Sequence, residues 1–151
     1  MKMMSVKLPY LSGLKSYFSI FVLSVAGMIA LHYAAWQGKV EPVRLLLEHG
    51  SPVDEKADDG GTALHLASQH GHYDVVNMLL VQHADPRIVN NAHRTPIDSA
   101  CEFGRFRVVE LLIKSSQCQE LLKDQADDMV DNEHTTCLHL AARNGHTDIV
   151  K

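Results

Sequence analysis

The stretch TALHLASQHGHYDVVNMLL, residues 62–80, determines the fold that we predict for this chain of 151 residues. Leu64 and Ala67 are three residues apart, so they lie on one face of a short first helix. Gly71 follows at a point where glycine can end a helix in the left-handed conformation. Asp74 then falls in the first turn of a second helix, where a carboxylate interacts favourably with the helix dipole. The stretch therefore predicts two helices joined by a tight turn.

The second helix carries an apolar stripe that occurs at three places along the chain. In each place a valine is followed, three and four residues later, by leucine or isoleucine, which is the spacing of one helix face. The three sets are Val43-Leu46-Leu47, Val76-Leu79-Leu80 and Val109-Leu112-Ile113. Pro42 lies at the start of the first of these helices, where a missing N–H costs little. We expect all three stripes to be buried.

The whole unit repeats at fixed intervals. Three columns of residues advance in the same steps of 33, 33 and 41 positions. The columns are His32, His65, Asp98 and His139; Gly38, Gly71, Gly104 and Gly145; and Val43, Val76, Val109 and Val150. One unit cannot bury its stripe alone, whereas stacking on a neighbour buries it. The predicted fold is an all-α solenoid of stacked helix-turn-helix units with hairpin loops.

The steps divide the chain into four units after an N-terminal segment. The predicted repeats span about 27–59, 60–92, 93–133 and 134–151, the last of which stops inside its second helix. An acidic insertion at 115–133 accounts for the longer third step. Two interpretations of this insertion stay open, a solvated loop and an electrostatic contact with a basic partner.

Two segments at the motif histidines resemble the ankyrin-repeat consensus. They are Thr62-Ala63-Leu64-His65-Leu66-Ala67 and Thr136-Cys137-Leu138-His139-Leu140-Ala141-Ala142-Arg143-Asn144-Gly145-His146. The resemblance runs from about residue 27 to the end, and it implies that the motif histidine is structural and bonds neighbouring backbone. The structural motif residues are His32, Thr62, His65, Gly71, Thr95, Gly104, Thr136, His139 and Gly145. We expect the threonines to cap the first helices.

The sequence departs from the ankyrin pattern at two motif positions. Ile29 and Ala30 replace the usual Thr-Pro pair in the first repeat, and Asp98 replaces histidine in the third. A closer similarity exists to the middle ankyrin repeats of the caskin scaffold proteins. It rests on the segments 31–38, 41–46, 70–75 and 100–105. In that family SH3 and SAM domains follow the ankyrin block, and neither is encoded here.

The N-terminal segment, residues 1–26, does not fit the repeat. Lys2, Lys7 and Lys15 precede an uncharged apolar run, and Ser24-Val25-Ala26 resembles the small-residue site of a secretory signal. Residues 16–31 are uncharged but shorter than the roughly 20 residues that span a bilayer. Either the segment is a true signal or anchor, or a misassigned first exon or truncated clone has left an apolar segment that covers the first repeat. We expect a cytoplasmic protein under the second interpretation, and a secreted or membrane-anchored one under the first.

Composition and motifs exclude several functions. The formal net charge of −4 disfavours a nucleic-acid binder. No nucleotide-binding loop or nucleophile motif occurs, so we predict no enzyme activity, small-molecule substrate or cofactor. His70 and His72 are two histidines without a third ligand, so we predict no metal site. We expect Cys101 and Cys137 to be buried, reduced thiols, and Cys118 lies in the insertion.

The resemblance also implies where a protein partner would bind, because ankyrin proteins use the ends of their first helices and their hairpin tips. The corresponding residues are Trp36, Gln37, Asp58, Asp59, Gln69, His70, Asn91, Arg94, Glu102, Phe103, Arg143 and Asn144. Trp36 and Phe103 are large aromatics at these positions, and each is either an interface anchor or a packing residue. Two functions stay open: a non-catalytic adaptor or scaffold module in signalling, and a targeting or regulatory domain of a larger enzyme or channel.

Overall fold

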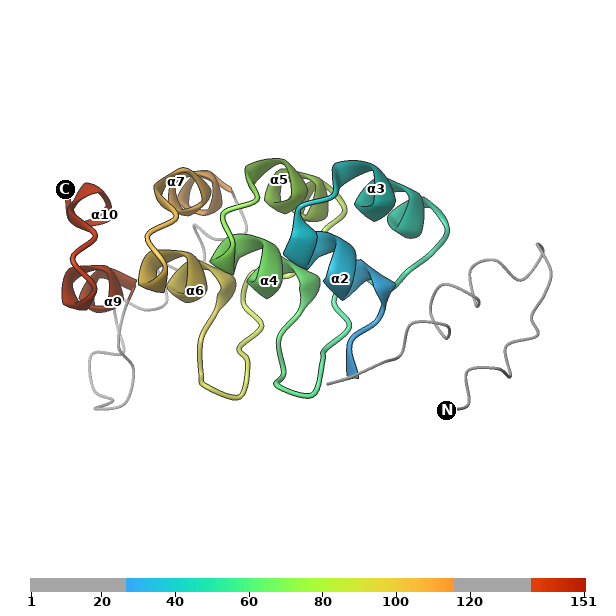
Figure 1. The fold of residues 1–151 in the computed structure, drawn as a ribbon, viewed down its shortest axis with the longest axis horizontal. Helices are drawn as coiled ribbons and strands as arrows, with labels where there is room; N and C mark the ends of the chain where they lie inside the picture. Colours follow the sequence, from blue (N-terminus) through green and yellow to red (C-terminus); the bar gives the residue numbers. More distant parts are fainter. Residues whose placement is uncertain (1–26, 116–136) are drawn as a thin grey trace.

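Two rows of helices run along the molecule, with hairpin loops projecting from the inner row (Figure 1). The structure is a computed structural model that describes residues 27–115 and 137–151, and the predictions for 1–26 and most of the insertion lie outside these ranges. The inner helices are α2 (Ala30–Gln37), α4 (Ala63–Gln69), α6 (Pro96–Glu102) and α9 (Cys137–Arg143). The outer helices are α3 (Val40–Glu48), α5 (Tyr73–Val81), α7 (Phe106–Lys114) and α10 (Thr147–Val150). The predicted all-α solenoid is confirmed, and the described residues form no strand.

A glycine in the left-handed conformation separates the two helices of each repeat, as predicted. The φ angle of Gly38 is +72° and that of Gly71 is +74°. A Cβ atom on Gly38 would lie 2.5 Å from Nδ1 of His72, which belongs to the next repeat. This position therefore needs glycine for its backbone conformation and for the close approach of the neighbouring turn.

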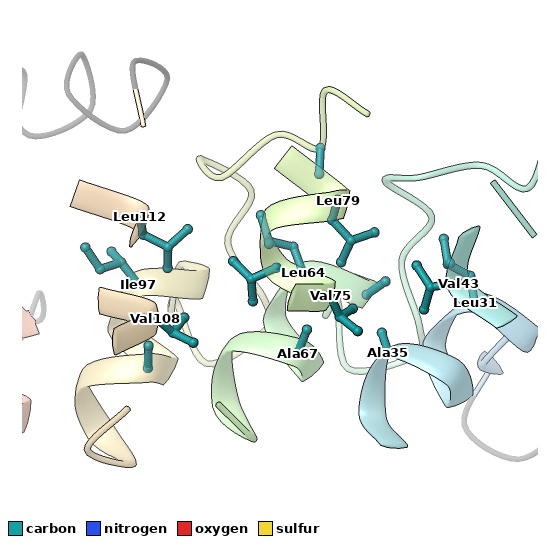
Figure 2. Close-up of a cluster of buried hydrophobic side chains, with 14 of the residues drawn as sticks. Leu31, Ala35, Val43, Leu64, Ala67, Val75, Leu79, Ile97, Val108 and Leu112 are labelled. Atoms are coloured by element: carbon teal, nitrogen blue, oxygen red, sulfur yellow. The ribbon is translucent and has the colours of Figure 1, made fainter. Parts of the chain in front are cut away.

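The apolar stripes of both rows meet in one continuous seam (Figure 2). Leu64 of α4 and Leu79 of α5 are fully buried, as is Leu112 of α7. The prediction for Ile113 is wrong, because its side chain is 42% exposed. Val108 is buried in its place, since it lies four residues before Leu112 and shares its helix face, whereas Ile113 is turned about 100° away.

The motif histidines tie each inner helix to the hairpin that follows it. In His32, Nδ1 accepts a hydrogen bond from the Ile29 N–H at 3.1 Å, and Nε2 bonds the Glu55 carbonyl at 2.9 Å. His65 repeats the pattern, with Nδ1 accepting from the Thr62 N–H and Nε2 bonding the Arg94 carbonyl at 2.9 Å. Both rings are therefore neutral, and the structural role implied by the ankyrin resemblance is confirmed for them.

His139 differs from these two histidines, because its side chain is exposed. The carbonyls that hold His32 and His65 come from the hairpin after each repeat. The structural role implied for His139 therefore stays a prediction.

The threonine caps differ between repeats. Thr95 Oγ1 accepts from the Asp98 N–H at 3.4 Å, which confirms the predicted cap of α6. At α4, Thr62 and His65 form a capping box, and the Thr62 hydroxyl also lies 3.0 Å from Nδ1 of His65. Asp98 replaces the histidine acceptor, with its carboxylate accepting from the Thr95 N–H at 2.9 Å. A carboxylate has no N–H, so the third repeat lacks the donor that binds the following hairpin in the first two.

Cys101 of α6 and Cys137 of α9 are joined in a disulfide. Our expectation of two reduced thiols is therefore wrong, although Cys101 is buried as predicted. The pairing is hidden in the sequence because the residues are 36 positions apart, across the insertion.

Among the described helices, none combines the length and the apolar character that crossing a bilayer requires.

We predict that acidification from about pH 7.5 to about pH 5.5 lowers the free energy of unfolding. Burial lowers the pKa values of His32 and His65 below the usual value near 6.5, so the unfolded chain binds more protons than the native chain in this range. The contribution of both residues is complete above about pH 6.5 and decreases as the pH falls below it. Urea denaturation at several pH values measures the effect.

Asp98 contributes to the pH dependence with the opposite sign. Burial raises its pKa above the usual value near 3.8, so its stabilising contribution is lost as the pH rises through the native pKa. A free energy of unfolding that is constant between about pH 7.5 and about pH 5.5 would show that the two histidines do not need to be neutral.

Candidate partner-binding surface

The predicted binding residues lie in the two places that the ankyrin resemblance implies. Trp36 and Gln37 end α2, and Gln69 and His70 end α4. The corresponding residues at the ends of α6 and α9 are Glu102, Phe103, Arg143 and Asn144. Because each inner helix stops at the turn before the left-handed glycine, these residues repeat along one edge of the inner row (Figure 1).

Four aromatic side chains gather at the first two repeats, and we call them the Trp36 cluster: Tyr33, Trp36, His70 and His72. The Trp36 ring centroid lies 6.3 Å from that of Tyr33 and 6.2 Å from that of His70. The His70 and His72 rings stack with centroids 6.1 Å apart. Trp36 is 45% exposed, so it both packs against the next repeat and presents one part of its indole to solvent.

The backbone of the Trp36 cluster is fixed by the next repeat. Nε2 of His72 donates to the Trp36 carbonyl at 2.8 Å, and the Arg105 guanidinium donates to the Gln69 carbonyl at 2.9 Å in the same way. Burial, and then the charges of His72 and Arg105, lower the pKa of His70. His70 is therefore neutral near pH 7, and its ring adds to the aromatic surface of the cluster without adding a charge.

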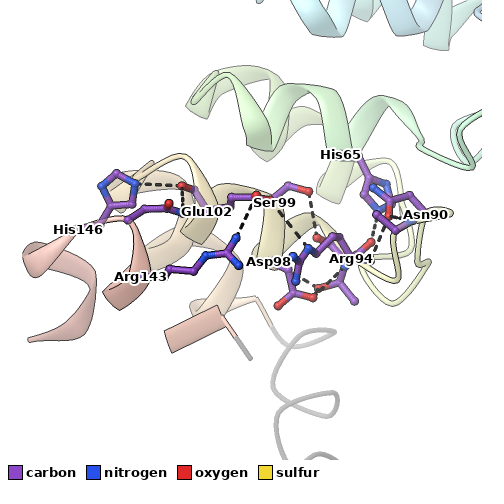
Figure 3. Close-up of polar contacts among 11 residues, drawn as sticks. His65, Asn90, Arg94, Asp98, Ser99, Glu102, Arg143 and His146 are labelled. Atoms are coloured by element: carbon purple, nitrogen blue, oxygen red, sulfur yellow. Dashed lines mark hydrogen bonds and ion pairs between the residues drawn. The ribbon is translucent and has the colours of Figure 1, made fainter. Parts of the chain in front are cut away.

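A charged group lies farther along the same edge (Figure 3). The Glu102 carboxylate is 3.9 Å from Nε of Arg94 and 4.0 Å from Nη2 of Arg143. The Glu102 carbonyl accepts from Nε2 of His146 at 2.9 Å and from the side-chain amide of Asn144 at 3.1 Å. Glu102 and Asn144 thus join the third and fourth repeats, while Arg143 remains exposed.

The hairpin residues link neighbouring loops. Asn91 donates from its backbone to the Asp59 carbonyl at 2.8 Å and from its side chain to the Asp58 carbonyl at 3.0 Å. The Asp59 carboxylate accepts from the Gly61 N–H at 2.8 Å. The carboxylates of Asp58 and Asp59 are exposed on the first hairpin. The first two hairpins are therefore connected, with acidic groups at the tip of the first.

Phe103 is the second exposed aromatic at a predicted binding position, with 46% of its surface accessible. Phe106, at the start of α7, is equally exposed, so neither ring belongs to the core. Sequence reasoning missed Tyr33 and His72 as members of the Trp36 cluster. Tyr33 could have been found from its position three residues before Trp36, on the same helix face.

The groups on this surface are ones that can recognise another molecule. Within residues 27–115 and 137–151, no group of three potential metal ligands occurs, and His70 and His72 stand as a stacked pair. The surface combines half-exposed aromatic rings, an arginine-flanked carboxylate and acidic hairpin tips, which are groups that bind other molecules through packing and hydrogen bonds.

Comparison with known proteins decides the family. The family model "Ankyrin repeats (3 copies)" matches residues 10–90, 31–120 and 79–151. The chain belongs to the ankyrin-repeat family. The first match begins inside the N-terminal segment that we separated from the repeats. Ankyrin repeats are a protein-interaction module, which agrees with the absence of a catalytic motif in this sequence.

Several curated relatives share this module. The human "Ankyrin repeat domain-containing protein 63" is 36% identical over 72% of this chain and 28% of its own length. The "Probable E3 ubiquitin-protein ligase XBOS33" of rice is 32% identical over 80% of this chain and 30% of its own length. The human "Transient receptor potential cation channel subfamily A member 1" is 30% identical over 83% of this chain and 11% of its own length. The chain thus spans less than a third of the length of each of these relatives.

Proposed function

We propose that this chain is a non-catalytic module of a cytoplasmic signalling scaffold or adaptor, of the caskin type, and that it binds a protein partner through its concave face. The half-exposed Trp36 cluster carries this proposal. The sequence similarity to the caskin ankyrin block supports the scaffold role. No cofactor, nucleic acid or small-molecule substrate takes part, and the chain is a part of a longer protein.

The Trp36 cluster has the properties of an interface anchor. Tyr33 and His70 flank the indole of Trp36, and the His72 bond fixes its backbone, so little conformational freedom is left to lose on binding. A tryptophan that is half exposed and surrounded by polar groups is a frequent hot spot. The acidic hairpin tips and Arg143 would then select the charge pattern of the partner.

We expect Trp36→Ala to weaken partner binding by about 2 kcal/mol, or about 30-fold in Kd, because the anchor loses its aromatic surface. The partner is first identified with a photo-crosslinking amino acid in place of Gln37, the exposed neighbour of Trp36, in the full chain. Isothermal titration with the identified protein then gives the affinity.

Val81→Ala is the matched control, because Val81 is 64% exposed but lies at the end of the outer helix α5. We expect this variant to bind like the unmodified chain. Thermal unfolding of both variants separates binding from folding. Unchanged affinity in Trp36→Ala, or an equal loss in both variants, would refute the proposed surface.

A second candidate function is a targeting or regulatory domain of a larger enzyme or channel. It is favoured by the names of two relatives, a probable ubiquitin ligase and a cation channel. Complete sequencing of the transcript distinguishes the two functions. A catalytic or membrane-spanning domain encoded in the same reading frame would replace the adaptor proposal by this one.

The proposed cytoplasmic location depends on residues 1–26, which could instead lead the chain into the secretory pathway or anchor it in a membrane. Fusion of this segment to a reporter with a glycosylation site tests the location. The cytoplasmic proposal expects a reporter that stays inside the cell without glycosylation. A glycosylated or secreted reporter would overturn it.

A further inference from the structure

The disulfide occupies facing positions that recur at every junction between repeats. Cys101 lies three residues before Gly104, and Cys137 lies eight residues before Gly145. The corresponding pairs are Ala35 with Ala63 at the first junction and Ser68 with Pro96 at the second. Only the third junction places a thiol on both sides, and its Cα atoms are 5.3 Å apart, within the usual range for a disulfide.

We propose that Cys101 and Cys137 form a reversible thiol–disulfide site that fastens the fourth repeat to the third, with glutathione-type thiols and their disulfides as reaction partners. The two cysteines differ in accessibility, because Cys101 is fully buried and Cys137 is half-buried. An attacking thiolate therefore reaches the bond at the sulfur of Cys137. This inference concerns the chain alone and does not depend on the partner-binding proposal.

The fourth repeat is the one whose docking depends most on a covalent link. In α9 only Leu140 and Ala141 are buried, and α10 buries no residue. By contrast, α6 buries five residues and α7 buries three. Beyond the disulfide, His146 and Asn144 hold the junction through the Glu102 carbonyl, and both bonds lie near the surface. Loss of the covalent link should therefore loosen α9 and α10 before any other part of the stack.

The reaction balances as two successive thiol exchanges. A thiolate attacks the sulfur of Cys137, forms a mixed disulfide there and releases the Cys101 thiolate, which takes a proton from water. A second thiol attacks the mixed disulfide, releases Cys137 as a thiol and leaves as the small-molecule disulfide. The protein disulfide gains two electrons and two protons, and two small thiols are oxidised. The oxidised small molecule drives the reverse reaction.

The test uses the full chain with Cys118→Ala, so that the pair holds the only thiols. The protein is equilibrated in glutathione buffers that span cytosolic to endoplasmic-reticulum potentials, and the free thiols are then alkylated and measured by mass spectrometry. We expect the oxidised fraction to change smoothly across this range. Hydrogen exchange of α9 and α10 should be about 10-fold faster in the reduced state, with α4 and α5 unchanged.

Cys137→Ala is the second variant, and it removes the disulfide. It should still fold, because alanine occupies the same motif position in the first two repeats, as Ala30 and Ala63. This variant should exchange like the reduced chain in every buffer. A pair that stays fully oxidised or fully reduced over the whole range would overturn the proposal. Equal exchange of α9 and α10 in the two states, or between Cys137→Ala and the oxidised chain, would also overturn it.

Discussion

Replacement of Leu64 by alanine is expected to lower the free energy of unfolding by about 3 kcal/mol. The Leu64 side chain is fully buried in α4, which packs against α2, α5 and α6 (Figure 2). Truncation removes buried apolar atoms and leaves a cavity that the rigid helix rows fill only in part. Because each repeat is held only by its neighbours, a defect in α4 weakens two junctions at once. Urea denaturation followed by circular dichroism measures the loss.

Val81→Ala serves as the control for this prediction, because it also shortens an apolar side chain but at an exposed site. A surface substitution of this kind should change the free energy of unfolding by no more than about 0.5 kcal/mol. A loss of stability in Leu64→Ala as small as that in the control would mean that the seam between the rows does not hold the stack together.

The parts of the fold that the sequence predicts are those determined by spacing within one repeat. Gly38 and Gly71 end the inner helices in the left-handed conformation because few other residues adopt it at low cost. The stripe residues Val76 and Leu79 are buried because a helix presents every third or fourth residue to the same side. The periodicity within one repeat is sufficient to predict these glycines and buried residues. The repeat length of 33 residues then gives their positions in the neighbouring repeat.

The features that sequence reasoning missed depend on contacts between repeats. The sequence separation of Cys101 and Cys137 does not indicate the disulfide, because the insertion lies between them. Their facing positions follow only when each cysteine is numbered relative to the left-handed glycine of its own repeat. The Trp36 cluster likewise combines α2 with the turn after α4, and a helical pattern does not show which side chain of the next repeat it meets. Ile113 shows that spacing alone does not fix burial. A stripe of residues three and four positions apart includes one at the edge of the buried helix face, and such a residue can remain exposed.

His65→Ala should lower the free energy of unfolding by about 3 kcal/mol, although it removes a polar side chain. The His65 ring satisfies three groups: the Thr62 N–H, the Thr62 hydroxyl and the Arg94 carbonyl. Thr62 is completely buried, so its donors would lose their partner without access to water, and each buried unsatisfied group costs about 1–3 kcal/mol. The second hairpin would also lose its attachment to α4. Urea denaturation near pH 7.5 tests the effect.

His139→Ala is the matched control, because it makes the same substitution at the same motif position, where the side chain is exposed. We expect it to lower the free energy of unfolding clearly less than His65→Ala does, because groups around an exposed side chain can bond water instead. His65→Ala should in addition reduce the loss of stability between about pH 7.5 and about pH 5.5, since one histidine that must remain neutral is gone. Equal effects of the two substitutions would show that the motif histidine contributes through its local helix rather than through the hairpin. An unchanged pH dependence in His65→Ala would assign the acid sensitivity to His32 or to groups outside the motif.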